Sequence, residues 1–178
     1  RVADPVYNAQ VICEQAKEAA EHGAKIVVFP ELCITGYTCN DLFLQELLLE
    51  KAKEALLTIA EETGQLETLF LVGLPVDKDG RLYNVAAVLY RGRILGMIPK
   101  KNIPMYAEFY EGRHFTPGEE TVTEYRLGKQ VIPFGSNLLF RCEELPELIL
   151  GCELCEDLWV AEPPSTSHAL MGATVIAN

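Results

Sequence analysis

The sequence predicts an α/β fold in which a mixed β-sheet is covered by helices. The first third of the chain alternates between segments of helical periodicity and a short β-branched run. The middle third contains apolar runs separated by turn residues, a pattern typical of β-hairpins. The last residues follow the order strand, helix, strand. A chain of 178 residues can bury a sizeable core and no internal repeat divides it, so we expect a single domain over residues 1–178.

Two helices with a strand between them are predicted for the N-terminal third. Apolar residues recur at helical spacing over residues 8–23, and Gly23 ends that segment. The run KIVVFPE (25–31) is rich in β-branched residues and predicts a buried strand. Asp41 is then predicted to cap a long helix that extends to about Glu62.

The rest of the chain is predicted to consist mostly of strands. They are expected over 68–75, 81–90, 93–100, 129–134, 137–143 and 147–154, with a tight hairpin turn at Arg91 and Gly92. A helix over 165–172, capped by Ser165, leads to a last strand over 173–178. Residues 101–128 look irregular, and a loop of this length inside a domain is usually functional.

Composition and charge exclude several classes of protein. Hydrophobic residues make up 49% of the chain, which is a globular composition. The formal net charge of −11 argues against binding to nucleic acid or to an anionic membrane surface, because both require a basic patch. No apolar run approaches the ~20 residues that cross a bilayer.

The ends of the chain and its cysteines indicate a compartment. The opening residues are polar and do not resemble a secretory leader. Six cysteines are present, but a chain this long and apolar does not need disulfides. We therefore expect a cytoplasmic protein with free thiols. No strand precedes the first helix and the chain stops after a buried-looking strand, so we expect the domain to be incomplete at both ends.

Three polar residues directly follow three apolar strands. Glu31 follows VVFP, Lys100 follows ILGMIP and Cys155 follows LILGCEL. If these strands are parallel neighbours, the three side chains converge at the carboxyl edge of the sheet. The carboxylate can then take the thiol proton, while the ammonium favours the thiolate and a developing oxyanion. Strand-end acids and lysines are also often solvated loop residues, so spacing alone leaves both interpretations open.

Cys152 and Cys155 also form a CxxC pair, which raises the alternative of a metal or redox site. A second close cysteine pair is missing, and the pair ends a strand instead of opening a helix. We expect no metal site, and we interpret Cys152 as a core thiol. Asp157 is predicted to pin the loop backbone and Trp159 to anchor packing. Three histidines (His22, His114 and His168) show no ligand spacing and are interpreted as surface or loop residues.

Three stretches resemble the motif blocks of the nitrilase (carbon–nitrogen hydrolase) superfamily. They are FPELCITGY (29–37), PKKNIPMYAEFYE (99–111) with the later FTPG, and CEDLWVAEPPS (155–165). The second and third blocks resemble more narrowly the N-terminal glutaminase domains of glutamine-dependent NAD synthetases. The resemblance covers essentially the whole chain, with the blocks in the same order. It implies a nitrilase-like α-β-β-α sandwich with mixed sheets.

The resemblance also implies roles for individual residues. Glu31 matches the general base of the family, Lys100 the catalytic lysine and Cys155 the nucleophile. Glu111 matches a second glutamate that supports the lysine. Two further residues, Tyr106 and Glu156, match positions near the glutamine substrate.

The reaction implied by the resemblance is hydrolysis of the glutamine side-chain amide through a cysteine thioester. The ammonia would pass to a synthetase domain that amidates nicotinic acid adenine dinucleotide to NAD. No cofactor is implied for the hydrolysis; ATP and Mg²⁺ are expected only in that synthetase domain, which this chain lacks. The implied partners are glutamine, the synthetase domain of the same protein and further copies in a homo-oligomer. Independent activity of so short a segment is doubtful on this resemblance.

Two rival functions are weighed against this one. Another amidohydrolase of the superfamily, such as a carbamoylase or an ω-amidase, would share the three catalytic residues but not the substrate. The stretch from Pro104 to Glu111 argues against it. The second rival is a non-catalytic interaction or metal-binding module, in which the same residues are structural.

Overall fold

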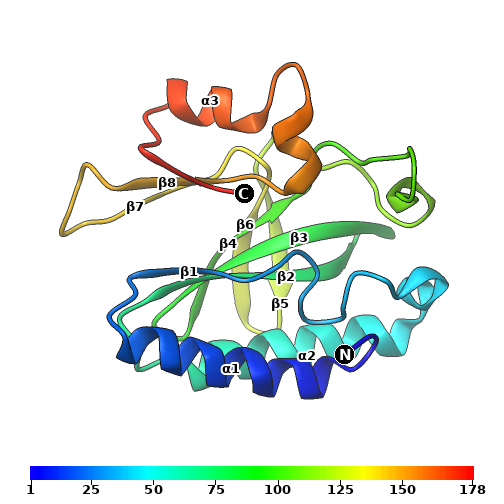
Figure 1. Ribbon diagram of the computed structural model, residues 1–178, viewed down its shortest axis with the longest axis horizontal. Coiled ribbons are helices and arrows are strands. Elements are labelled where there is room, and N and C mark those ends of the chain that lie inside the picture. The colour runs from blue at the N-terminus through cyan, green and yellow to red at the C-terminus, as the bar shows by residue number, and fades with distance from the viewer.

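The computed structural model describes residues 1–178, and its elements stack in four layers (Figure 1). Helices α1 (Pro5–Glu21) and α2 (Glu46–Glu62) lie side by side under a six-stranded sheet. A three-stranded sheet lies on the other side of the larger one, and helix α3 (Pro164–Leu170) covers it. The order helix, sheet, sheet, helix is the predicted α-β-β-α sandwich. None of the helices has the length and apolar character needed to cross a membrane.

Helix α1 confirms the first predicted helix but starts three residues earlier. The Asp4 carboxylate caps it by accepting the N–H of Tyr7 at 3.2 Å, and Pro5 occupies the first turn. Both are strong start signals, because the cap satisfies a free donor and proline lacks the N–H that would be unpaired there. Gly23 follows the helix with a φ of +86°, as its predicted role as a stop requires.

The predicted capping role of Asp41 is wrong. A 3₁₀ turn, η1 (Asn40–Leu44), precedes α2, and Gln45 between them is extended. The Asp41 carboxylate instead accepts hydrogen bonds from Arg113 at 2.8 and 3.0 Å and contacts His114 at 3.1 Å. Those hydrogen bonds lower the pKa of Asp41. A charge partner 72 residues away was not visible in the local pattern.

The larger sheet contains six strands in the order β1-β2-β3-β4-β6-β5. Their bounds are β1 (Ile26–Val28), β2 (Leu69–Lys78), β3 (Arg81–Tyr90), β4 (Arg93–Pro99), β5 (Thr123–Leu127) and β6 (Gln130–Phe134). The β1–β2 and β4–β6 pairs are parallel, and the others are antiparallel. The predicted turn between β3 and β4 is confirmed, since Arg91 and Gly92 have φ values of +47° and +75°.

Strand β5 was not predicted, because it lies inside the segment expected to be irregular. Only Tyr125 and Leu127 of its five residues are buried, and the others are polar and exposed. So short an alternation gives a weak signal. The rest of residues 101–128 has no regular element except the 3₁₀ turn η2 (Glu111–Arg113).

The smaller sheet has the order β7-β8-β9, with β7 (Leu139–Arg141), β8 (Ile149–Cys152) and β9 (Val175–Ala177). Helix α3 joins the parallel strands β8 and β9, as the final strand–helix–strand pattern predicts.

Ser165 is not the N-cap of α3: Pro163 holds that position, and the Ser165 N–H donates to the Glu153 carboxylate at 2.9 Å. The expectation that His168 is a surface residue is also wrong, because α3 buries it completely beside Gly151.

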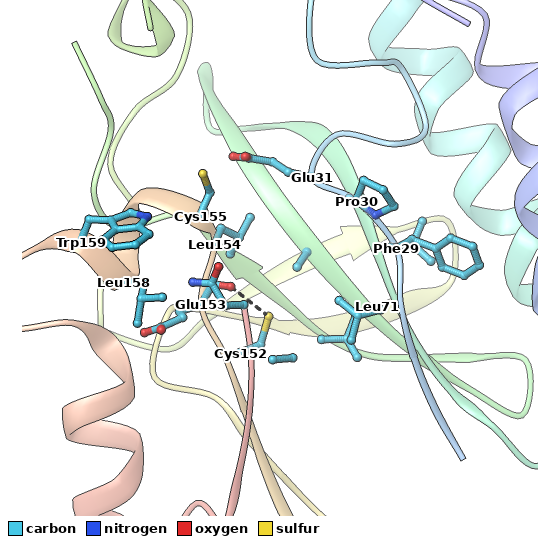
Figure 2. Close-up of a pocket in the computed structure, with 16 residues that line it drawn as sticks. Phe29, Pro30, Glu31, Leu71, Cys152, Glu153, Leu154, Cys155, Leu158 and Trp159 are labelled. Carbon is cyan, nitrogen blue, oxygen red and sulfur yellow. Dashed lines mark hydrogen bonds between the residues drawn. The ribbon is translucent and has the colours of Figure 1, made fainter. Parts of the chain in front are cut away.

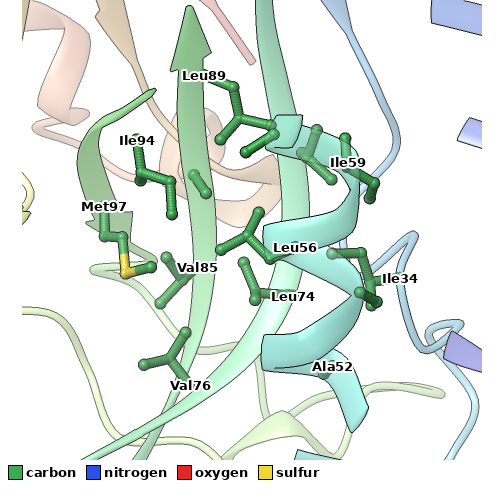
Figure 3. Close-up of a cluster of buried hydrophobic side chains, with 14 of the residues drawn as sticks. Ile34, Ala52, Leu56, Ile59, Leu74, Val76, Val85, Leu89, Ile94 and Met97 are labelled. Carbon is green, nitrogen blue, oxygen red and sulfur yellow. The ribbon is translucent and has the colours of Figure 1, made fainter. Parts of the chain in front are cut away.

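Alternation along the strands divides the core into two layers. One face of β2 and β3 packs against the helices, and Figure 3 shows Leu56 and Ile59 of α2 among Leu74 and Val85. The opposite face, including Leu71, joins residues of the smaller sheet. Because the two sheets pack face to face, the end of β8 lies over the ends of β1 and β4. The three predicted site residues thus come from two facing sheets, and not from neighbouring strands of one sheet.

Candidate active site

Glu31 is presented by a tight turn directly after β1. The Phe29 N–H continues the pairing to Leu71 O at 2.9 Å, and the chain then turns through Leu32, whose φ is +52°. This turn lies directly on β2, where any Cβ at Gly73 would collide with the Leu32 backbone nitrogen. A glycine on strand β2 is therefore required for the turn that carries Glu31 to pack this closely against the strand.

Lys100 is the first residue after β4 and is completely buried. Its backbone N–H donates to Asn84 O at 2.8 Å, and its carbonyl accepts the Gly118 N–H at 2.7 Å. Its Nζ lies 2.7 Å from Glu31 Oε1 and 2.6 Å from Glu111 Oε1. Glu111 comes from η2 and is also buried. The ammonium thus forms the centre of a charged cluster of Glu31, Lys100 and Glu111.

Cys155 begins the 3₁₀ turn η3 (Cys155–Trp159) and is the one exposed cysteine of the six. Its φ of +45° places it in the left-handed region, which residues with a Cβ adopt only at a cost. Figure 2 shows the Glu31 carboxylate extending toward Cys155, and both residues line one cleft. The three predicted catalytic residues therefore meet in space.

Asp157 fixes the position of the Cys155 turn relative to the Lys100 loop. It is buried and accepts the Leu154 N–H at 3.0 Å and the backbone and side-chain N–H groups of Asn102 at 2.7 and 2.9 Å. These bonds tie the residue before Cys155 to the second residue after Lys100. The prediction that Asp157 pins the loop backbone is confirmed.

The two glutamates of the cluster are equipped for different tasks. Glu111 accepts from Lys100 and from the Tyr37 hydroxyl (2.7 Å) at Oε1, and from Asn84 at Oε2, so both oxygens have donors. Glu31 accepts from Lys100 and Asn84 at Oε1 alone, and its side chain is 18% exposed. Glu31 Oε2 is consequently free to take a proton, whereas Glu111 acts as a counter-ion to the lysine.

The cluster changes the acidity of its basic and thiol members. Burial raises the pKa of the Cys155 thiol, and Glu31 raises it further, while Lys100 lowers it. The pKa of the thiol is raised overall, because burial and the charges of Glu31, Glu111 and Glu156 together outweigh the opposing effect of Lys100, so the expected ammonium-stabilised thiolate is not the resting state. Burial by itself would lower the pKa of Lys100, but the charges and hydrogen bonds of Glu31 and Glu111 raise it overall. A protonated thiol needs a base, and Glu31 is placed to be that base.

Neutralising Glu31 makes the Cys155 thiol more acidic. The Glu31→Gln substitution removes the largest charge contribution that raises the thiol pKa, so the pH midpoint of its alkylation by iodoacetamide falls. The rate at Cys155 is followed by peptide mapping across neutral and alkaline pH. Glu61→Gln, an exposed acid on α2, is the matched control and leaves the midpoint unchanged. A midpoint that stays or rises in Glu31→Gln contradicts the arrangement.

A cleft of about 320 Å³ opens beside these residues, between β1 and η3 (Figure 2). Its walls are mainly apolar, and they include Val28, Leu71, Ala86, Leu154, Leu158 and Trp159. Trp159 is 75% exposed, so the expectation that it anchors packing is wrong. It ends the short turn η3 and lines the cleft instead.

Cys152 lies under the cleft in the core, and burial raises its pKa to about 12, as suits an inert thiol.

The two predicted substrate-binding residues contact each other. The Tyr106 hydroxyl donates to Glu156 Oε2 at 2.7 Å, across 50 residues of chain. Tyr106 is exposed, and Glu156 directly follows Cys155. The pair thus presents a carboxylate and a phenol next to the thiol.

Sequence reasoning missed two members of the cluster, Asn84 and Tyr37. Asn84 stands alone as a buried amide in the apolar strand β3, and an unexplained polar residue in such a run is a usable signal. Tyr37 ends the motif stretch that begins at Phe29, but no role was assigned to it. Burial and its hydrogen bond to Glu111 raise the pKa of Tyr37, so it remains a neutral donor.

Comparisons with known proteins agree with this geometry. All of residues 1–178 match the family model described as carbon-nitrogen hydrolase. The chain is 41% identical over 177 residues to a protein of Mycobacterium tuberculosis (strain ATCC 25618 / H37Rv) named glutamine-dependent NAD(+) synthetase, covering 99% of this chain and 26% of that protein. The chain thus spans about a quarter of the length of the curated relatives it matches.

Solved structures show the same fold. The crystal structure of a glutamine-dependent NAD(+) synthetase from Cytophaga hutchinsonii matches with a TM-score of 0.86 and 29% identity, over 99% of this chain and 28% of that one. A mutant of the Nesterenkonia AN1 amidase from the nitrilase superfamily matches with a TM-score of 0.72 and 22% identity, over 99% and 59% of the two chains. The predicted nitrilase-like sandwich is confirmed.

Proposed function

The chain belongs to the carbon-nitrogen hydrolase family, and from that premise we propose that it hydrolyses the side-chain amide of glutamine through a thioester on Cys155. One observation carries the proposal. A Glu31–Lys100–Glu111 cluster, in which Lys100 and Glu111 are buried, lies beside an exposed thiol on a strained turn, at the mouth of a cleft. Such a cluster supplies a nucleophile, a base and a cation for a developing oxyanion.

In the first half of the reaction, Cys155 Sγ attacks the amide carbon and Glu31 Oε2 takes the thiol proton. Lys100 Nζ, with two of its three N–H groups given to the carboxylates, uses the third for the oxyanion. The proton on Glu31 then passes to the amide nitrogen as the C–N bond breaks. Ammonia leaves, and the glutamyl group remains on Sγ as a thioester.

In the second half, a water molecule attacks the thioester carbon and gives a proton to Glu31. The C–S bond breaks, and the proton returns to Sγ. Glutamate leaves with a new oxygen from water, and the thiol is restored. The sum of the two halves is glutamine plus water giving glutamate plus ammonia. These steps use the side chains of this chain and water, and no cofactor enters them.

Support for glutamine as the substrate comes from the residues beside the thiol. Glu156, held by the Tyr106 hydroxyl, provides a carboxylate that suits the ammonium of an α-amino acid. The Mycobacterium tuberculosis relative and the Cytophaga hutchinsonii structure described above carry glutamine dependence in their names. A simple aliphatic amide has no group for Glu156 to bind, which favours glutamine over the substrates of other amidohydrolases in this superfamily.

The product ammonia would serve an amidation elsewhere in a longer protein. The relatives are named NAD(+) synthetases and are about four times the length of this chain. We place the amidation of nicotinic acid adenine dinucleotide, with its need for ATP and Mg²⁺, in a synthetase domain outside residues 1–178. In that arrangement these residues form part of a single glutaminase domain in a cytoplasmic homo-oligomer.

A glutamine-mimicking diazoketone tests the proposal directly. Such a reagent alkylates a thiol with loss of N₂ only when the glutamine site orients it, so peptide-mapped mass should show one adduct, on Cys155. Excess glutamine should prevent it. An equal dose of iodoacetamide is the control for simple thiol exposure. The exposed Cys155 should react with it faster than the buried cysteines whether or not a glutamine site is present.

The possible outcomes separate the rivals. Labelling of Cys155 by iodoacetamide but not by the diazoketone reports only the exposure of the thiol and removes glutamine as the substrate, which leaves another amidohydrolase or a non-catalytic module. No preference for Cys155 with either reagent overturns the nucleophile itself and leaves a non-catalytic module.

A further inference from the structure

Asn84 is a fully buried amide in an otherwise apolar part of β3, and it reaches both carboxylates of the cluster. Its Nδ2 donates to Glu31 Oε1 at 2.5 Å and to Glu111 Oε2 at 3.3 Å. An amide nitrogen carries two hydrogens, so one group can serve both acids at once. Its backbone carbonyl separately accepts the Lys100 N–H. Any residue could do the latter, but the side-chain contacts need an amide.

The orientation of this amide is set by charge. Asn84 Oδ1 is buried and has no hydrogen-bond donor. Rotating the amide by half a turn would place Oδ1 against two carboxylates and remove both hydrogen bonds. Leaving a buried acceptor unpaired is unfavourable, and the two charge-assisted bonds from Nδ2 are what offset it. The Asn84 side chain is therefore oriented so that Nδ2 binds the two acids, although this leaves its Oδ1 without a hydrogen-bond donor.

The consequence for Glu31 is an asymmetric carboxylate. Asn84 and Lys100 both donate to Oε1, and no protein group donates to Oε2. Oε1 is thereby fixed by two donors, while Oε2 has none, and the carboxylate lies on the side of Cys155 in Figure 2. Without Asn84, the lysine alone would hold Glu31, and the carboxylate could rotate about that single contact.

We propose that Asn84 is a positioning residue, which holds Glu31 and Glu111 on either side of Lys100 and leaves Glu31 Oε2 to exchange the proton with the thiol. This rests on the function proposed above. The other charged and titratable groups that face these acids are Lys100 at the end of β4, Tyr37 from the loop after Glu31, and Cys155 and Glu156 from η3.

Two substitutions, studied in the protein at its natural length, test the role. Asn84→Leu keeps the approximate shape and removes both donors, so kcat for glutamine hydrolysis falls roughly 10- to 100-fold while KM changes little. Asn84→Ser retains one hydroxyl donor and should give intermediate values, which is a partial rescue.

A matched control comes from the same strand. Val88 lies on the same face of β3 as Asn84, is fully buried and makes no polar side-chain contact. Val88→Ala weakens the packing but leaves kcat for glutamine hydrolysis close to the wild-type value, so it separates positioning from general loss of stability. An Asn84→Leu enzyme with unchanged kcat overturns the inference, and so does one in which KM changes as much as kcat. If that variant does not fold, the same comparison is decided with Asn84→Ser.

A substrate-independent measurement separates this inference from the proposed function. In a double-mutant cycle of Asn84→Ser and Glu111→Gln, each single substitution lowers the equilibrium constant of folding by some factor. The double variant should be roughly fivefold more stable than the product of these two factors predicts, because the two residues contact each other. Strictly additive effects contradict the role of Asn84 even if glutamine proves not to be the substrate. If the wild-type enzyme does not hydrolyse glutamine but the double-mutant cycle shows coupling between Asn84 and Glu111, only the proposed function is overturned.

Discussion

Replacing Cys155 by alanine lowers glutamine hydrolysis by at least about 10⁴-fold and leaves the fold intact. The thiol is the one nucleophile at the mouth of the cleft, and the cluster of Glu31, Lys100 and Glu111 cannot form the thioester without it. Its side chain is exposed, so little packing is lost, and the free energy of unfolding should change by less than about 1 kcal/mol. Ammonia release and thermal unfolding of the same preparation measure the two effects.

The control for this experiment is Cys142→Ala. Cys142 is a half-buried thiol in the connection between β7 and β8, away from the charged cluster. This variant should retain its ammonia release. Glutamine hydrolysis in Cys155→Ala at more than about one hundredth of the wild-type rate would be incompatible with a thioester route.

Replacing Lys100 by methionine has the largest expected effect on stability. Methionine has a similar volume, but it leaves Glu31 and Glu111 facing each other without a cation inside the core. Removing one partner from a buried ion pair typically costs about 3–5 kcal/mol, and the same loss is expected here. Hydrolysis should fall by about 10³-fold or more, since the oxyanion loses its donor.

The neighbouring residue supplies the control. Lys101 pairs with Glu120 at the surface, and exposed pairs contribute about 0–1 kcal/mol, so Lys101→Met should be nearly neutral. Denaturant unfolding of both variants gives the comparison. Adding Glu111→Gln to Lys100→Met removes the repulsion and should recover part of the stability without recovering activity. Equal stability of Lys100→Met and wild type would show that the buried charges do not hold the core together.

The Lys100 contribution also has a defined pH window. The folded pKa of Lys100 is raised, so its stabilisation is fully present below its unfolded pKa of about 10.4 and is lost as pH rises through the folded value. Wild type should therefore lose stability at alkaline pH through this group. In the Lys100→Met variant, the free energy of unfolding should fall less steeply with rising pH, because this group is absent.

Local sequence patterns were sufficient for the strand ends that carry the catalytic residues. Each of Glu31, Lys100 and Cys155 directly follows an apolar run. In the structure Glu31 and Cys155 line one cleft, and the buried Lys100 Nζ lies 2.7 Å from Glu31 Oε1. Their convergence was argued from parallel neighbours in one sheet, which is wrong because β8 belongs to the second sheet. Which strands share a sheet depends on long-range pairing, and periodicity does not report it.

Other parts of the site depend on contacts that a local pattern cannot contain. The role of Glu111 came only from the family resemblance, since nothing near it in the chain marks a buried carboxylate. The partner of Asp41 lies on η2, and the left-handed backbone of Cys155 arises in a turn held by Asp157. The partner of Asp41 is 72 residues away, and Asp157, which holds the Cys155 turn, bonds to Asn102 55 residues back along the chain.

The bonds of Asp157 to Asn102 have a consequence for the order in which the protein folds. Glu31 and Lys100 are 69 residues apart in the chain, and Asp157 closes a loop of 55 residues back to Asn102. Contacts over such separations form late, because chain closure is slow and entropically unfavourable. A nascent chain that has formed only its helices and hairpins would thus carry a Cys155 with no base beside it. We expect the capacity to release ammonia to arise only in the last folding step, when the second sheet docks on the first.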